Sequence, residues 1–84
     1  MAHLIKAQIV DKKQHPIAGA IVILTNGPDS FQEIAAITNE NGVFQLTAGQ
    51  KSGVYTLSAH YDGQTKPFSI ALPQKETTPI FVWE

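Results

Sequence analysis

The side chains that could act in catalysis or bind a metal are spread along this sequence and form no local group. Its three histidines are His3, His15 and His60. A zinc site needs histidines in close pairs or on adjacent strands, and no two of these form a local pair. His15 adjoins Pro16 in a polar segment, and His60 lies on the polar side of an alternating segment. We therefore expect solvated histidines and no metal site.

The carboxylates and hydroxyls give no stronger sign of a reaction. Asp11, Asp29, Glu40 and Asp62 all fall in segments rich in turn residues, where an aspartate side chain commonly bonds the local backbone. A calcium site needs several closely spaced oxygen ligands, and residues 39–41 are the nearest approach to that pattern. The Gly-x-Ser-x-Gly motif of an activated serine is absent. We expect no catalytic residue and no cofactor.

The composition argues against several classes of partner. The chain has 84 residues, no cysteine, no arginine, six lysines, seven acidic residues and a formal net charge of −1. So few basic residues argue against a nucleic-acid-binding face, and the longest apolar run, residues 17–24, is far shorter than the ~20 residues of a membrane span. No signal peptide is recognisable. We expect one domain, residues 1–84, taken from a larger protein that is cytoplasmic or exported as part of an assembly.

Apolar residues that alternate or run continuously between turn residues predict strands and no helix. The predicted strands are His3–Val10, Ala20–Asn26, Glu33–Thr38, Val43–Ala48, Val54–Tyr61, Thr65–Leu72 and Thr78–Trp83. The unbroken aliphatic run in the second predicts a strand covered at least in part on both faces. Strands at this spacing favour an all-β, two-sheet antiparallel sandwich.

Three glycines mark predicted turns. Asn41-Gly42 and Asp62-Gly63 are hairpin signals, because both residues of such a pair adopt positive φ readily. Gly19 would let the chain enter the following strand tightly or with a bulge.

The last strand is the most informative segment for binding. Ile80, Phe81, Val82 and Trp83 are all apolar, so both of its faces carry hydrophobic side chains. We expect Ile80 and Val82 to join the core and Phe81 and Trp83 to point outward. An exposed aromatic pair can mark a partner site, although a loop could equally cover it.

The predicted partner-binding residues are Phe81, Trp83, Pro67 and His60. Pro67 interrupts its strand, which predicts an edge strand or a bulge rather than a central position. Binding would combine pairing along an edge strand with an apolar anchor.

Three segments together resemble the carboxypeptidase regulatory-like domain family. Residues 5–24 contain Pro-Ile-Ala-Gly-Ala-Ile-Val-Ile-Leu, similar to the family's Pro-Leu-x-Gly-Ala-x-Val-x-Leu. Residues 36–46 resemble its Thr-Asp-x-x-Gly-x-Phe signature, and residues 53–59 resemble its Gly-x-Tyr-x-Leu-x-Val strand. The resemblance implies a transthyretin-like (prealbumin-like) fold, a seven-stranded antiparallel Greek-key β-sandwich.

What the resemblance implies about function depends on the setting. The enzyme that shares this fold, hydroxyisourate hydrolase, uses histidines, an arginine and a C-terminal Tyr-Arg-Gly-Ser motif, whereas this chain has no arginine and ends in Phe-Val-Trp-Glu. Similar domains follow the catalytic domain of metallocarboxypeptidases or are appended to secreted and surface proteins. Others end the VgrG spike protein of bacterial type VI secretion systems, where they help hold a toxic effector.

We therefore expect a non-catalytic interaction or adaptor module. Its partner would be another protein, such as a secreted effector, or the rest of its own parent chain, with no nucleic acid and no membrane insertion. The alternatives are a structural spacer without a ligand, a carbohydrate-binding module that uses Trp83, Phe81, Phe31 and Tyr61, and an enzyme, which no cluster of titratable residues supports.

Overall fold

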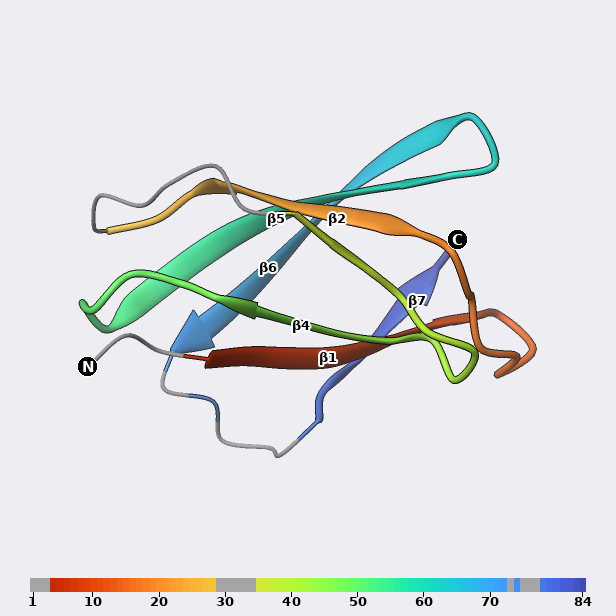
Figure 1. The fold of residues 1–84 in the computed structure, drawn as a ribbon, viewed down its shortest axis with the longest axis horizontal. Coiled ribbons are helices and arrows are strands. Elements are labelled where there is room, and N and C mark those ends of the chain that lie inside the picture. Colours follow the sequence, from red (N-terminus) through yellow and green to blue (C-terminus); the bar gives the residue numbers. More distant parts are fainter. Residues whose placement is uncertain (1–3, 29–34, 73, 75–77) are drawn as a thin grey trace.

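The computed structural model describes residues 4–28, 35–72, 74 and 78–84, and these form two packed sheets. The strands are β1 (Leu4–Asp11), β2 (Ile21–Asn26), β3 (Ala35–Ile37), β4 (Val43–Thr47), β5 (Gly53–Tyr61), β6 (Gln64–Leu72) and β7 (Ile80–Trp83). One sheet has the order β4-β1-β7 and the other has the order β3-β2-β5-β6. Figure 1 shows β1, β4 and β7 in one layer, with β2, β5 and β6 in the layer that faces it.

The predicted all-β sandwich is confirmed, and each predicted strand is present with small differences at its ends. His3, Glu33 and Ile34 lie outside the described residues. Among the described residues no helix is long and apolar enough to cross a membrane.

One strand pair departs from the predicted antiparallel arrangement. β1 and β7 run parallel, with Gln8 beside Ile80 and Asp11 beside Trp83. The antiparallel direction is imposed by tight hairpins. The connection between β6 and β7 instead crosses from one sheet to the other, so β7 is free to enter alongside β1 in the same direction.

A glutamine side chain extends the pairing on this side of β1. The backbone N–H of Lys6 donates to Oε1 of Gln74 at 2.9 Å, and Nε2 of Gln74 donates to the carbonyl of Lys6 at 3.0 Å. Further along, the N–H of Gln8 donates to the carbonyl of Pro79 at 2.9 Å. Backbone groups of β1 are therefore bonded on this side before β7 begins.

The core lies between the two layers and follows from alternation along the strands. Side chains at every second position of a strand share one face, and Ile5, Ala7 and Ile9 of β1 are fully buried, as predicted. They pack with buried side chains of the facing sheet, among them Val22 and Leu24 of β2. Since the chain has no cysteine, this apolar packing holds the sheets together without a disulfide.

Tyr55 of β5 combines a buried ring with a bonded hydroxyl. Its side chain is fully buried, and the hydroxyl donates to the carbonyl of Lys51 at 2.7 Å. A buried tyrosine hydroxyl without a partner would cost free energy, so this bond allows the largest fully buried side chain of the core to be a tyrosine.

The outer face of β2 is covered only in part, which agrees with the prediction of a strand covered at least in part on both faces. Ile21 is 43% exposed and Ile23 is half-buried. Both lie on the outer face of the four-stranded sheet, beside Ile37 and Ala35 of β3. No described element covers Ile21, so this face keeps exposed aliphatic side chains.

The Asp62-Gly63 hairpin is confirmed. β5 and β6 pair antiparallel up to Tyr61 and Gln64, and Asp62 and Gly63 have φ angles of 51° and 72°. Two positive φ angles in a two-residue loop are typical of a type I′ turn. Gly19 also has a positive φ, 79°, just before β2.

The Asn41-Gly42 hairpin prediction is wrong, although the turn exists. β3 and β4 belong to different sheets, and Gly42 has a positive φ of 74° whereas Asn41 does not. The turn closes when the N–H of Gly42 donates to the carbonyl of Asn39 at 2.9 Å. The segment therefore carries the chain from one layer to the other instead of folding it back beside its neighbour.

We predict that Gly42→Ala destabilises the domain far more than Gly63→Ala. Both glycines have positive φ, where an alanine costs about 1–2 kcal/mol. A Cβ at Gly63 meets open space, whereas a Cβ at Gly42 would lie 2.4 Å from the carbonyl oxygen of Ile9. Urea unfolding of the two variants measures the difference, and equal losses of stability would contradict the close approach at Gly42.

Candidate functional site

The outward orientation predicted for Phe81 and Trp83 is wrong. Ile80 and Val82 are 53% and 41% exposed, whereas Phe81 and Trp83 are half-buried and pack against the core. The register explains the reversal, because Phe81 lies beside the fully buried Ile9 of β1. Residues paired across two strands point to the same face, so Phe81 and Trp83 must face the opposite sheet.

Phe81 and Trp83 belong to a row of aromatic rings that joins the two layers, which we call the aromatic row (Phe44, Phe81, Phe68, Trp83 and Tyr61). Phe81 stacks on Phe68 with ring centroids 4.9 Å apart, and on Phe44 at 6.4 Å. Trp83 lies 6.3 Å from Phe68 and meets Tyr61 edge-on at 5.8 Å. Such pairs contribute about 0.5–1.5 kcal/mol each beyond the burial of their surface.

A lysine lies over one ring of the aromatic row. Nζ of Lys66 on β6 lies 5.5 Å from the centroid of the Trp83 ring, within the range of a cation–π contact. This contact and the stacking of Phe68 were not predicted, because nothing local in the sequence places β6 opposite β7. The hydrophobic alternation of β6 was the available signal for Phe68.

Pro67 and His60 lie on a different surface from the aromatic row. Pro67 is on β6, an edge strand of the four-stranded sheet as predicted, and pairs with Ser58. His60 pairs with Thr65 of the same edge strand. Both sit on the outer face of this sheet, so the structure divides the four predicted partner-binding residues into two pairs.

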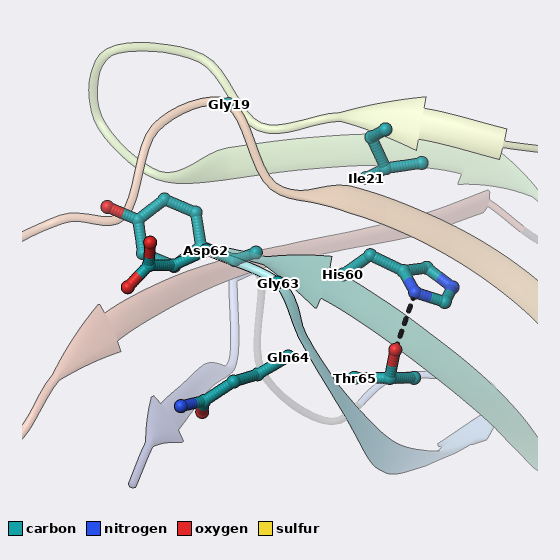
Figure 2. A pocket seen from close by; sticks show the side chains of 8 residues that line it. Gly19, Ile21, His60, Asp62, Gly63, Gln64 and Thr65 are labelled. Carbon is teal, nitrogen blue, oxygen red and sulfur yellow. Dashed lines mark hydrogen bonds between the residues drawn. The ribbon is translucent and has the colours of Figure 1, made fainter.

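His60 lies in a hollow of about 530 Å³ at the turn end of the β5–β6 hairpin. Figure 2 shows its ring bonded to Thr65, with Gly19 and Ile21 on the β2 side and Asp62, Gly63 and Gln64 on the hairpin. Nδ1 of His60 and Oγ1 of Thr65 are 2.7 Å apart. Three residues singled out in the sequence, Gly19, His60 and Gly63, thus line one hollow.

Among the residues that the structure describes, the His60–Thr65 pair lacks the remaining parts of a nucleophile site. Activation of a hydroxyl needs a base that is itself oriented by a third group, and among the described residues no carboxylate bonds His60. The described residues also include no group of three His, Cys, Asp or Glu side chains that could hold a metal ion. Within the described part of the chain, the only side-chain hydrogen bond that the structure shows for His60 is therefore the one to Thr65.

A second hollow of about 440 Å³ adjoins Trp83 and the turn after β1. It is lined by Asp11, Lys12, Lys13, His15, Trp83 and Glu84. Oδ1 of Asp11 accepts the backbone N–H groups of Lys13 at 2.8 Å and His15 at 2.9 Å. The N–H of His15 is the main reason that the pKa of Asp11 lies below its ordinary value. The carboxylate of Asp11 therefore holds the turn.

The family model for the carboxypeptidase regulatory-like domain matches residues 5–82. The match runs from β1 into β7 and so includes both sheets and four members of the aromatic row. No curated protein matches the chain.

We predict that Trp83→Ala destabilises the domain by about 2 kcal/mol, because it removes a half-buried ring that contacts Phe68 and Tyr61. Ile80→Ala is the matched control on the same strand, since Ile80 is 53% exposed and should change stability little. Chemical denaturation of both variants tests the inward orientation. A larger loss of stability from Ile80→Ala than from Trp83→Ala would indicate that Ile80 points inward and Trp83 outward.

We also predict that Asp11→Asn makes the free energy of unfolding less dependent on pH in the acid range. Because the pKa of Asp11 is lowered in the folded state, its carboxylate contributes stability above the unfolded pKa of about 3.9. That contribution is lost as the pH falls through the lower folded pKa. Asparagine keeps an oxygen for the N–H groups of Lys13 and His15 but does not titrate.

The measurement is the free energy of unfolding between about pH 5 and about pH 2. The natural chain should lose more stability over this range than Asp11→Asn. Identical pH profiles would show that the turn does not stabilise the ionised carboxylate.

Proposed function

The chain belongs to the carboxypeptidase regulatory-like domain family, and from this premise we propose that it is a non-catalytic module that binds another protein along the edge of β7. The observation that carries the proposal is the character of this edge. β7 ends the order β4-β1-β7, so one of its sides has no strand beside it among the described residues. Unpaired backbone groups on such an edge can pair with an extended segment of another chain.

Comparison of the edge strands favours β7. β6 carries Lys66 and Pro67, the residue types with which proteins block pairing at an edge. β3 spans three residues and contacts the edge strand β4. β7 has neither charge nor proline among its four residues, Ile80–Trp83.

The side chains of β7 define the partner that would fit. Ile80 and Val82 are exposed on the outer face of the three-stranded sheet, and Phe81 and Trp83 face the other layer. An added strand would place alternate side chains beside these two pairs. The partner is thus an extended segment with apolar residues at alternating positions. Its outward contacts on β7 would be Ile80 and Val82, and not Phe81 and Trp83 as the sequence predicted.

The settings implied by the resemblance all remain compatible with this mode of binding. A secreted effector held on a type VI secretion spike is one such partner, and a neighbouring domain of the parent chain is another. The carbohydrate-binding alternative receives less support, because Phe81 and Trp83 use their rings within the aromatic row. Phe31 lies outside the described residues.

We predict that a photo-crosslinking amino acid at Val82 gives an adduct with the partner in the full parent protein, in cells of its source. Val54 is the matched control, because it is also an exposed valine, at 61%, but lies on the central strand β5. Adducts are detected as a shift in mobility and located by mass spectrometry. Adding Ile80→Lys, which places a charge on the edge, should remove the Val82 adduct.

Two outcomes would contradict the proposal. Absence of an adduct from either position supports the structural spacer. Equal adducts from Val54 and Val82, unaffected by Ile80→Lys, would indicate that the partner binds the outer face of the four-stranded sheet instead.

A further inference from the structure

The chain contains two Asn-Gly pairs, Asn26-Gly27 and Asn41-Gly42. Glycine has no Cβ to hinder its backbone nitrogen, so in this dipeptide the nitrogen can attack the asparagine side-chain amide. The two pairs have the same local chemistry and lie in different structural surroundings. The fold therefore decides which of them reacts.

At Asn26-Gly27 the backbone nitrogen lies close to the asparagine side chain. The backbone N–H of Gly27 donates to Oδ1 of Asn26 at 2.9 Å, so the nitrogen lies next to the amide that it would attack. Asn26 is exposed at the end of β2, where the pairing with β5 shifts its register after Leu24. The nitrogen of Gly27 is thus held by the asparagine side chain and lies beyond the strand ladder.

Gly27 cannot be exchanged for a bulkier residue that would hinder its nitrogen. A Cβ at this position would lie 2.3 Å from Cδ2 of the buried Tyr55 ring. The packing of this backbone on Tyr55 therefore requires a glycine at position 27, and glycine is the residue that hinders attack on Asn26 least.

At Asn41-Gly42 the backbone is bonded on both sides. The N–H of Gly42 donates to the carbonyl of Asn39 at 2.9 Å, and the carbonyl of Gly42 accepts from Ile9 at 2.8 Å. The carbonyl of Asn41 accepts from Nε2 of Gln8 at 2.7 Å. Attack by the nitrogen of Gly42 would first require the loss of its turn bond, and Gly42 is buried.

We propose that Asn26 is a site of spontaneous deamidation and that the fold protects Asn41. Hydroxide or another solvent base removes the proton of the Gly27 N–H, and the nitrogen attacks Cγ of Asn26. The bond from Cγ to Nδ2 breaks, and ammonia leaves after taking a proton from solvent. Water then opens the cyclic imide at either carbonyl and gives aspartate or isoaspartate.

The reaction would change the domain at one defined point. It replaces a neutral amide by a carboxylate and so takes the formal net charge from −1 to −2. Isoaspartate also routes the backbone through the side-chain carbon, directly before the residue that packs on Tyr55. This inference is independent of binding at β7, because it rests on the geometry of the β2 end alone.

The experiment is incubation of the folded chain in mildly alkaline buffer, followed by peptide mapping with mass spectrometry. Both pairs fall within one tryptic peptide, residues 14–51, so cleavage after Glu33 and Glu40 is needed to separate them. We expect deamidation at Asn26 to be about ten-fold faster than at Asn41 or more, from the loss of one to two backbone hydrogen bonds at Asn41. Asn26→Asp provides the product standard.

Two controls distinguish the effect of the folded structure on the deamidation rate from the effect of the local sequence. In urea both pairs should react at similar rates, because they share the dipeptide and lose their surroundings. Gln8→Ala removes a bond to the Asn41 carbonyl and should raise the rate at Asn41 but not at Asn26. Equal rates at both sites in the folded chain, or the same ratio in urea as in buffer, would overturn the proposal.

Discussion

The alignment of β7 with β1 is the constraint on which the rest of this domain depends. It places Phe81 beside Ile9 and Trp83 beside Asp11, and this alone decides which face of an entirely apolar strand enters the interior. A shift by one residue would exchange the two faces. The aromatic row would then lose two of its rings, and with them the ring contacts between β6 and β7.

The aromatic row matters because the interior is small. A domain of this size buries only about 60–65% of the surface of its unfolded chain, and no disulfide supplements the packing. Aliphatic side chains of β1, β2 and β5 fill the centre between the layers. Stacked rings from both sheets close the side where β6 and β7 face each other, and Lys66 shields Trp83 there.

Alternation within a strand predicted the fold well, whereas contacts between strands that are distant in the sequence could not be predicted. Tyr55, Leu57 and Ala59 were assigned to one face, and all three are fully buried. In β7 every residue is apolar, so alternation could not indicate which face of the strand is buried. Only the register with β1 decides this. The Asn41-Gly42 turn was missed as a crossing between layers for a similar reason, because the dipeptide sets a local bend and not the sheet that the next strand joins. For the candidate site, the edge position of Pro67 was predicted, but its separation from Trp83 was not.

The parallel pairing of the first and last strands also determines how the domain carries a mechanical load. Tension applied through the two ends of the domain pulls β1 and β7 in opposite directions along their common axis, so the hydrogen bonds between them are sheared together instead of opening one at a time. The paired bonds between Gln74 and Lys6 lie in the same line and lengthen this shear contact. A domain built in this way resists unfolding when force acts between its first and last strands.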